Sequence, residues 1–330
     1  MDRDEKYPDI FFLPEWGKAF QELDNGEANI YEFKNDYGHI YYQFIKRRIP
    51  SHLNLPAYFD IITPYGFNGP VVLFCKDGRK EHLISEYKEE FLKYCIHENI
   101  ISEYVRFSPW LKNHLDFGNQ YDLKYNNYTL HTDLTVSDFF MEEFHKRVRN
   151  KIRVASKRGV TIEYDFKGTS LKEFYRLYQM TGEKNNFSEY YRFSYDFLSN
   201  SFSVLGNKQF IVNAKFDNNY ISSRIVLDHG EYVHDFLAGN DYQYIDLNAN
   251  SLILYEMAGW AKARGKKQLQ MGGAFSDSLF AFKKQFTKTG FCDFYIGKRI
   301  INEQVYKELV EKRIKLGNLE DSTYFPLYRG

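Results

Sequence analysis

The chain has 330 residues, of which 43% are hydrophobic and 18% aromatic, and its 44 Lys and Arg residues balance 44 Asp and Glu residues. This length exceeds the size at which a single core keeps growing, so we expect two domains, and the apolar content argues against a disordered chain. The balanced charge excludes a general preference for nucleic acid or for membranes, so any such preference must be local.

The cysteine pattern and the N-terminus both favour a cytoplasmic protein. Cys75, Cys95 and Cys292 are odd in number, far apart and without CxxC spacing, which argues against a disulfide framework or a zinc site. The N-terminus opens with charged residues instead of a signal peptide, and no run approaches the roughly 18 apolar residues that span a bilayer. We therefore expect a soluble, cytoplasmic chain with no membrane span, no DNA partner and no bound metal.

Predicted helices and strands alternate along the chain, and most of the strands are rich in β-branched and aromatic residues. The predicted helices cover residues 15–24, 81–97, 138–158, 170–181, 252–264, 277–288 and 302–315. The predicted strands cover residues 29–33, 39–50, the apolar runs on either side of 63–70, and residues 102–108, 121–134, 208–216, 219–229, 231–239, 267–271 and 291–297. This order predicts a mixed α/β (α+β) fold with two similar halves.

The motifs that mark several enzyme classes are missing from the sequence. There is no GxSxG elbow, HExxH pair, Walker loop or GxGxxG after a strand, so hydrolase, zincin, P-loop and Rossmann interpretations lose their usual support. His229 and His234 fall in neighbouring predicted strands, where we expect them to serve packing and hydrogen bonding instead of metal binding.

The predicted helix 138–158, with Ser137 as its cap, concentrates seven cations after His145. Lys146, Arg149, Arg153 and Lys157 fall within about 80° of each other on a helical wheel, opposite an apolar face. This is either a solvated helix face or a phosphate-binding surface, since arginines present bidentate donors to phosphate oxygens. The second interpretation makes Arg149 and Arg153 candidate ligand-binding residues.

Two glycine-containing segments are candidate ligand-binding loops. In "TPYGFNGP", residues 63–70, Tyr65 could stack on a base or sugar, and Gly69 would let the backbone approach a ligand closely. Gly272 and Gly273 follow a predicted strand and could free backbone amides to hold an anion. An ordinary strand connection and a tight turn are the alternative explanations.

Lys283 lies in an apolar stripe that Leu279, Phe282 and Phe286 form on the predicted helix 277–288. A cation in this position must either extend its ammonium to water or meet an anion, because an unpaired charge in low dielectric is unfavourable. We expect Lys283 to point toward an anionic or polarised ligand group. Arg224, inside a predicted strand, becomes a further anion-binding candidate if it faces a cleft.

Four segments in order, "RNKIRVASKRGVTIEY", "FYRLYQMTGEKNNFSEYYRF", "LNANSLILYEMAGWAKARGKKQLQMGG" and "LFAFKKQF", resemble the FemABX peptidyltransferases. The likeness is strongest across residues 147–290 and extends through most of the chain. It implies two GNAT-like domains around a shared cleft, with residues 1–143 in the first and residues 144–330 in the second. It also implies that the last helix can pack back on the first domain.

The resemblance implies roles for three cations. Lys283 matches the lysine of the family's FK motif, which lies beside the acceptor or the transferred acyl group. Lys18, in "EWGK", and Arg224 match residues that meet the phosphate of the precursor. One departure is Lys184, which stands where members of the family commonly have arginine, so the charge is kept without the fork geometry.

The function that the resemblance implies is aminoacyl transfer. The donor would be an aminoacyl-tRNA and the acceptor an amine of an anionic, nucleotide-linked peptidoglycan precursor, with no further cofactor. Lys283 would stabilise the developing oxyanion and would not act as the nucleophile. The alternatives are an N-acyltransferase that uses acetyl-CoA on a sugar or small amine, although the Q/R-x-x-G-x-G/A loop is missing, and a non-catalytic ligand or RNA binder.

Overall fold

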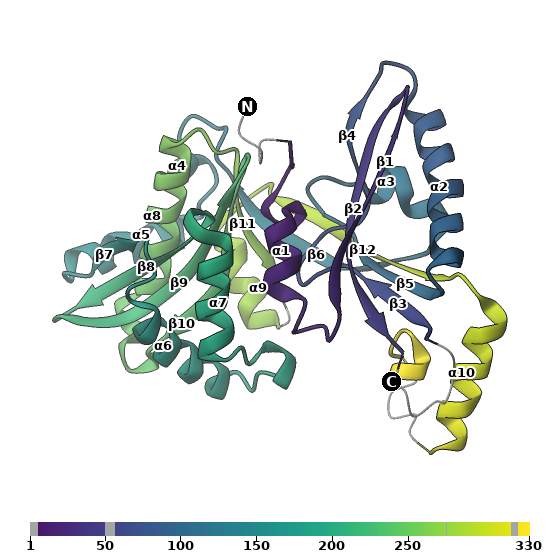
Figure 1. Cartoon of the computed structure of the whole chain (residues 1–330). Coiled ribbons are helices and arrows are strands. Elements are labelled where there is room, and N and C mark those ends of the chain that lie inside the picture. The colour runs from purple at the N-terminus through teal and green to yellow at the C-terminus, as the bar shows by residue number, and fades with distance from the viewer. Residues whose placement is uncertain (1–5, 50–56, 275, 318–322) are drawn as a thin grey trace. The chain divides into compact units, whose positions relative to one another are not determined.

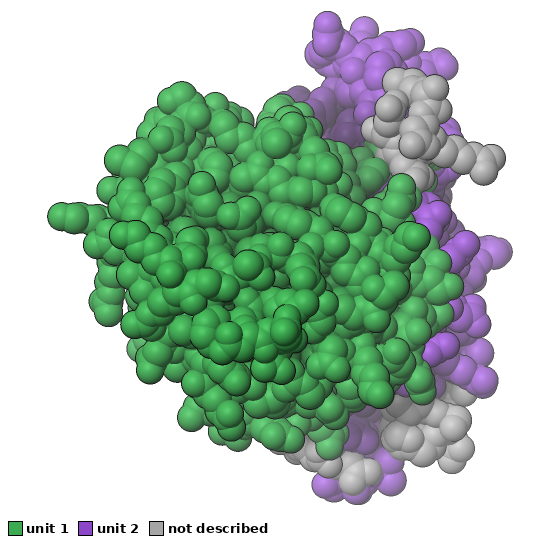
Figure 2. Space-filling model, turned by 90° about the vertical axis from the view of Figure 1, so that its left-hand side faces the viewer, with its two compact units in different colours: residues 1–10, 128–292 green, residues 11–127, 293–330 purple. Residues whose placement is uncertain are grey.

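The computed structural model describes residues 6–49, 57–274, 276–317 and 323–330, and the chain divides into two compact units (Figure 1). Unit 1 comprises residues 1–10 and 128–292, and unit 2 comprises residues 11–127 and 293–330, coloured green and purple in Figure 2. Each unit is a mixed, mostly antiparallel sheet with helices, which confirms the predicted fold class. Each unit also takes one segment from the far end of the chain.

Unit 1 contains a sheet with the strand order β6-β11-β10-β9-β8-β7. The pairing of β10 with β11 is parallel, and the other pairings within this sheet are antiparallel. Its strands are β6 (Asp122–Asp133, of which residues 128–133 belong to unit 1), β7 (Thr161–Asp165), β8 (Gln209–Phe216), β9 (Asn219–His229), β10 (Tyr232–Asn240) and β11 (Gln268–Gly273). Its helices are α4 (Phe139–Glu142), α5 (Lys146–Lys157), α6 (Leu171–Lys184), α7 (Tyr195–Leu205), α8 (Ala249–Ala263) and α9 (Asp277–Lys283).

The main core of unit 1 forms between this sheet and helices α5 and α8. Val148 and Ile152 of α5 are buried in one cluster with Met257 and Ala258 of α8 and Leu269 of β11. The i, i+3, i+4 spacing of apolar residues in α8 therefore predicts the buried face correctly. Strand β7 and helix α7 were not predicted, because their short apolar runs lack a clear period.

The prediction of one helix over residues 138–158 is wrong, because the chain breaks into α4 and α5. Asp138, and not Ser137, caps α4 through an acceptor oxygen 3.1 Å from the Met141 backbone nitrogen. Glu143 lies at the break, where it is 4% exposed and accepts hydrogen bonds from Thr287 Oγ1 (2.9 Å) and Lys288 N (3.2 Å).

The N-terminal arm of unit 1 is held by two histidines. His229 Nε2 lies 3.0 Å from the Tyr7 carbonyl oxygen, and His234 Nε2 lies 2.9 Å from Asp9 Oδ2. The predicted hydrogen-bonding role of His229 and His234 is therefore confirmed. Within the described ranges, no three His, Cys, Asp or Glu side chains gather in a way that could hold a metal ion.

Unit 2 contains a sheet with the strand order β1-β2-β3-β5-β12, and β4 pairs with β2. Strands β3 and β5 are parallel, whereas β2 is antiparallel to its three partners. Its strands are β1 (Glu27–Asn35), β2 (Gly38–Arg48), β3 (Phe59–Ile62), β4 (Val71–Cys75), β5 (Ile100–Arg106) and β12 (Phe291–Ile300, of which residues 293–300 belong to unit 2), and its helices are α1 (Pro14–Phe20), α2 (Lys80–His97), α3 (His114–Phe117) and α10 (Glu303–Lys315).

Two clusters of buried residues stabilise unit 2. The larger one packs Leu83, Tyr87 and Phe91 of α2 against the sheet. In the smaller one, Leu309 of α10 is buried with Tyr328, so the C-terminal helix belongs to this unit. Among the residues that the structure describes, no helix is both long enough and apolar enough to cross a bilayer.

Candidate active site

Lys283, the last residue of α9, is held by backbone carbonyl groups. Ser276 caps this short helix, with its Oγ accepting a hydrogen bond from Leu279 N at 3.2 Å. The Lys283 ammonium donates hydrogen bonds to the carbonyl oxygens of Met271 and Gly273, both at 2.5 Å. Two of its three N–H groups are thereby fixed, and the third is available to a ligand. Lys283 therefore does not extend its charge into solvent as a snorkelling lysine would.

A bulge in β11 supplies these carbonyl acceptors. Gln270 pairs with His131 and Gly272 with Leu130 of β6, so Met271 has no opposite residue in the ladder. Gly272 has φ +68°, and a Cβ placed on it would lie 4.0 Å from Lys283 Nζ. The backbone conformation, more than the space, therefore requires glycine at this position. Phe275, in the connection to α9, lies outside the described residues.

Strands β10 and β11 stop pairing at the same level. Their parallel register runs from Tyr232 opposite Gln268 to His234 opposite Gln270. Directly afterwards β10 has its own irregularity, between Asp235 and Leu237, in its pairing with β9. Asp235 and Met271 are thus the first residues of the two strands beyond the paired stretch, where backbone polar groups no longer satisfy each other across the strands.

Arg224 and Asp235 form a buried ion pair beside Lys283. Arg224 Nε lies 3.6 Å from Asp235 Oδ1, and the two side chains are only 6% and 8% exposed. Burial lowers the pKa of Lys283 to about 8, an effect that the carboxylate of Asp235 opposes and the guanidinium of Arg224 reinforces. With Lys283 protonated, the three residues carry two positive charges and one negative charge. A ligand anion or a developing oxyanion would balance the excess charge.

Asn250 fixes the orientation of Arg224. Arg224 Nη2 donates a hydrogen bond to Asn250 Oδ1 at 2.9 Å, and Ser222 Oγ lies 2.9 Å from the same oxygen. Asn250 does not cap α8, because the helix begins at Ala249 after Asn248, whose φ is +57°. The Asn250 side chain is inside the first turn and is therefore free to bind Arg224.

Asp235 is not among the site residues predicted from the sequence, although a signal for it is present. In the segment "YVHDFLAG", Asp235 is a charge inside an otherwise apolar strand, the same kind of anomaly that drew attention to Lys283. Pairing it with Arg224 required the register of β9 and β10, in which Val226 stands opposite Asp235. Side chains two residues apart on a strand share a face, so Arg224 lies on the same side of the sheet as Asp235.

The basic helix α5 begins next to the segment that follows Lys283. The backbone N–H of His145 donates to the Gln285 carbonyl at 2.9 Å. Arg149 Nη1 donates to the Phe144 carbonyl at 2.5 Å, and the Arg153 guanidinium lies 5.3 Å from the centroid of the Phe140 ring. In the described part of the chain, none of the seven cations between residues 146 and 158 forms an ion pair with a carboxylate.

The remaining predicted site residues belong to unit 2. Lys18 is exposed on α1. The Tyr65 carbonyl accepts a hydrogen bond from Trp16 Nε1 at 2.7 Å, and the Tyr65 ring stacks on Phe20 with centroids 5.3 Å apart. Gly69 has φ +92°, and a Cβ there would lie 2.9 Å from a methyl group of Val105. Packing within the unit thus accounts for Tyr65 and Gly69, and their ligand-binding roles stay predictions.

The comparisons with known proteins agree with this architecture. Residues 142–284, which include Arg224, Asp235 and Lys283, match a family model described as "Acetyltransferase (GNAT) domain". The crystal structure of FemX aligns with a TM-score of 0.71 at 16% identity, covering 91% of this chain and 94% of that chain. The chain therefore shares the fold of FemX over nearly its whole length, and residues 142–284 have a GNAT-like fold.

Two other solved structures align over nearly the whole chain. The C-terminal domain (DUF2156) of a putative lysylphosphatidylglycerol synthetase from Agrobacterium fabrum has a TM-score of 0.55 at 12% identity, covering 93% of this chain and 98% of its own. L-PGS from Bacillus licheniformis has a TM-score of 0.54 at 12% identity, covering 95% and 98%. No curated protein matches the sequence. These similarities establish the fold, and the chemistry must be argued from the site.

Proposed function

We propose that this protein is an acyltransferase that moves an aminoacyl group from aminoacyl-tRNA to an amine of a nucleotide-linked peptidoglycan precursor. The observation that carries the proposal is the Lys283 ammonium, anchored by two carbonyl oxygens beside the buried pair of Arg224 and Asp235. A lysine held in this way is positioned as a donor to a reacting carbonyl group. The likeness to FemX agrees with this choice of reaction.

The reaction places specific demands on the site. The acceptor amine attacks the ester carbonyl carbon of the donor, the carbonyl oxygen becomes an oxyanion, and the C–O bond to the tRNA ribose then breaks. The amine loses one proton, and the departing ribose oxygen gains one, so the step is balanced. The remaining N–H of Lys283 can donate to the oxyanion, and the two carbonyl acceptors keep it aimed without reorganisation.

The state of Lys283 supports a role as electrostatic stabiliser. The two hydrogen bonds to carbonyl acceptors favour the protonated ammonium, because a charged donor binds a carbonyl oxygen more strongly than a neutral amine does. With its pKa lowered to about 8 by burial, the side chain is mostly charged at neutral pH. The buried Arg224 adds positive potential, and in the proposal it also helps to hold an anionic group of the acceptor.

The choice of tRNA as donor rests on the charges of unit 1. The unpaired cations of α5 suit a run of phosphate groups, and α5 starts beside the segment after Lys283. The connection from β10 to α8 is a poor site for the diphosphate of CoA. Its carboxylates, Asp241 and Asp246, would repel the phosphates, and it has no glycine that would let backbone amides approach them closely. In the proposal, Lys18, Tyr65 and Gly69 of unit 2 serve the nucleotide-linked acceptor.

The second candidate is an N-acyltransferase that uses acetyl-CoA. It is favoured by the description of the matching family model as an acetyltransferase domain. Isothermal titration with CoA separates the candidates, because a CoA-dependent enzyme binds it in the micromolar range and a tRNA-dependent enzyme does not. Binding of CoA that Lys283→Met leaves intact, together with transfer of acetyl groups, would replace the leading proposal.

The decisive experiment is a transfer assay with a muramyl-pentapeptide nucleotide as acceptor. Aminoacyl-tRNAs and acyl-CoAs are offered in turn, and the mass shift of the acceptor reports the product. We expect an aminoacyl mass increase, which Lys283→Met should reduce by at least about a hundredfold, the scale of losing one oxyanion donor. Lys284→Met is the matched control, because the neighbouring Lys284 is exposed and lies only over the Phe280 ring. Equal rates for Lys283→Met and Lys284→Met would refute the assignment.

A further inference from the structure

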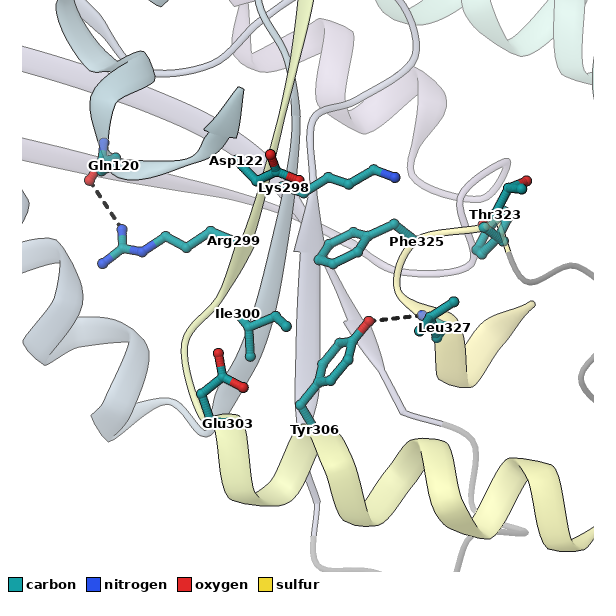
Figure 3. A pocket seen from close by; sticks show the side chains of 11 residues that line it. Gln120, Asp122, Lys298, Arg299, Ile300, Glu303, Tyr306, Thr323, Phe325 and Leu327 are labelled. Carbon is teal, nitrogen blue, oxygen red and sulfur yellow. Dashed lines mark hydrogen bonds between the residues drawn. The ribbon is translucent and has the colours of Figure 1, made fainter. Parts of the chain in front are cut away.

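Unit 2 contains a pocket that the proposed acyl transfer does not use. It has a volume of about 500 Å³ and lies among the start of β6, the end of β12, the first turns of α10 and the C-terminal segment (Figure 3). This is large enough for a ligand the size of a dipeptide. The residues that line it include Gln120, Asp122, Lys298, Arg299, Glu303, Tyr306 and Phe325.

One wall of the pocket is aromatic and well ordered by its own contacts. The rings of Tyr306 and Phe325 stack with centroids 6.0 Å apart and planes at 24°. Tyr306 is only 6% exposed, and its hydroxyl oxygen accepts a hydrogen bond from Leu327 N at 3.1 Å. Figure 3 shows both rings between the Lys298 side chain and α10. Such a wall offers a flat apolar surface to the body of a ligand.

The charges in the pocket fall into two classes. Arg299 is already engaged, with Nη1 3.1 Å from Gln120 Oε1 and 3.8 Å from a carboxylate oxygen of Glu103. Asp122 pairs with Lys124 at 3.0 Å. Arg299 therefore belongs to the framework of the pocket, whereas Asp122 is balanced by Lys124 in an exposed ion pair.

Two opposite charges remain uncommitted among the described residues. The ammonium of Lys298 lies 5.5 Å from the centroid of the Phe325 ring and has no carboxylate partner. Glu303, in the first turn of α10, forms no ion pair or side-chain hydrogen bond, and its position at the helix start is favourable for a carboxylate. The pocket thus offers one cation and one anion on either side of an aromatic wall.

We infer that this pocket binds a short zwitterionic peptide, with its carboxylate at Lys298, its ammonium at Glu303 and a side chain on Phe325 and Tyr306. The balanced charge decides the class of ligand. A nucleotide or another polyanion would gain one ion pair with Lys298 and would meet the Glu303 carboxylate with repulsion. This inference rests on unit 2 alone and is independent of the proposed transfer reaction.

The test uses isothermal titration of the full chain with the dipeptide L-alanyl-L-phenylalanine and two derivatives. The N-acetyl derivative lacks the ammonium, and the C-terminal amide lacks the carboxylate. We expect the dipeptide to bind, and both derivatives to bind about tenfold more weakly, the scale of one charge-assisted hydrogen bond. Lys298→Met should weaken the dipeptide and leave the affinity of the amide unchanged. Glu303→Gln should weaken the dipeptide and leave that of the N-acetyl form unchanged.

Matched controls come from α10. Lys307→Met and Glu311→Gln replace exposed residues of α10 that do not line the pocket, and they should leave dipeptide binding unchanged. Three results would each overturn the inference: no binding of the dipeptide, equal weakening of all three ligands by Lys298→Met, or tighter binding of uridine monophosphate than of the dipeptide. Lys298 and Glu303 lie outside the buried core, so thermal unfolding should confirm that both variants fold.

Discussion

The electrostatics of Lys283 predict an unusual dependence of stability on pH. Its pKa in the folded protein is about 8, against 10.5 for an unperturbed lysine. Between these two values the unfolded chain binds more protons than the folded protein, so the contribution of Lys283 to the free energy of unfolding increases as pH rises. Below pH 8 both states are protonated, and the full cost of the buried charge is present.

The perturbation that isolates this term is Lys283→Met, which removes the titrating group and keeps the volume of the side chain. One pKa unit corresponds to about 1.4 kcal/mol, so the wild type should gain about 1.3 kcal/mol relative to Lys283→Met between pH 7 and pH 9. Any constant effect of the lost carbonyl contacts cancels in this difference. The measurement is urea unfolding at both pH values, followed by circular dichroism, for the wild type, Lys283→Met and the control Lys284→Met.

Activity should move in the opposite direction from stability. If the charged ammonium stabilises the oxyanion, kcat/KM should fall as pH rises through about 8, the pH at which Lys283 loses its proton.

A gain in stability of the wild type that Lys283→Met also shows would contradict the reasoning, because the gain would then come from other groups. If the difference in free energy of unfolding between the wild type and Lys283→Met were the same at both pH values, Lys283 would not be desolvated in the folded state.

Three further predictions concern Asp235, Gly69 and the basic helix α5. Asp235→Asn removes the carboxylate that raises the pKa of Lys283, so the alkaline limb of the pH–activity profile should shift to lower pH, and an unchanged limb would argue against the contact. Gly69→Ala should destabilise the protein by about 1–3 kcal/mol in urea unfolding, because its φ of +92° is strained for alanine and its surroundings are closely packed. The double variant Arg149→Ala and Arg153→Ala should weaken tRNA binding and reduce the slope of log K against log salt by about two, whereas an unchanged slope would place the RNA elsewhere.

Local patterns in the sequence were enough for most of the secondary structure. The apolar spacing of α8 reflects the period by which a helix buries one face, and the continuous aromatic and β-branched runs of β2 and β9 are typical of strands buried on both faces. The break between α4 and α5 is a failure of the opposite kind, because it involves residues far apart in the chain. The carboxylate of Glu143, at the break, accepts hydrogen bonds from Thr287 and Lys288, and the spacing within residues 138–158 gives no sign of these donors.

The candidate site divides in the same way between sequence and structure. Lys283 could be identified from the sequence alone, because a cation in an apolar stripe needs a partner whatever the fold. The fold decides which group the Lys283 ammonium contacts, because the bulge in β11 turns the Met271 carbonyl toward it. Asp235 joined the site only through the register of β9 and β10.

The amino-acid sequence by itself determined the element types, the mixed α/β class and the residues whose chemistry demands an explanation, because these depend on spacing along the chain. The tertiary structure decided which distant segments form one unit, with residues 293–330 joining residues 11–127, and which charges face each other. Contacts between residues far apart in the chain leave no periodic trace in it, since each depends on strand register and on packing across the sheet.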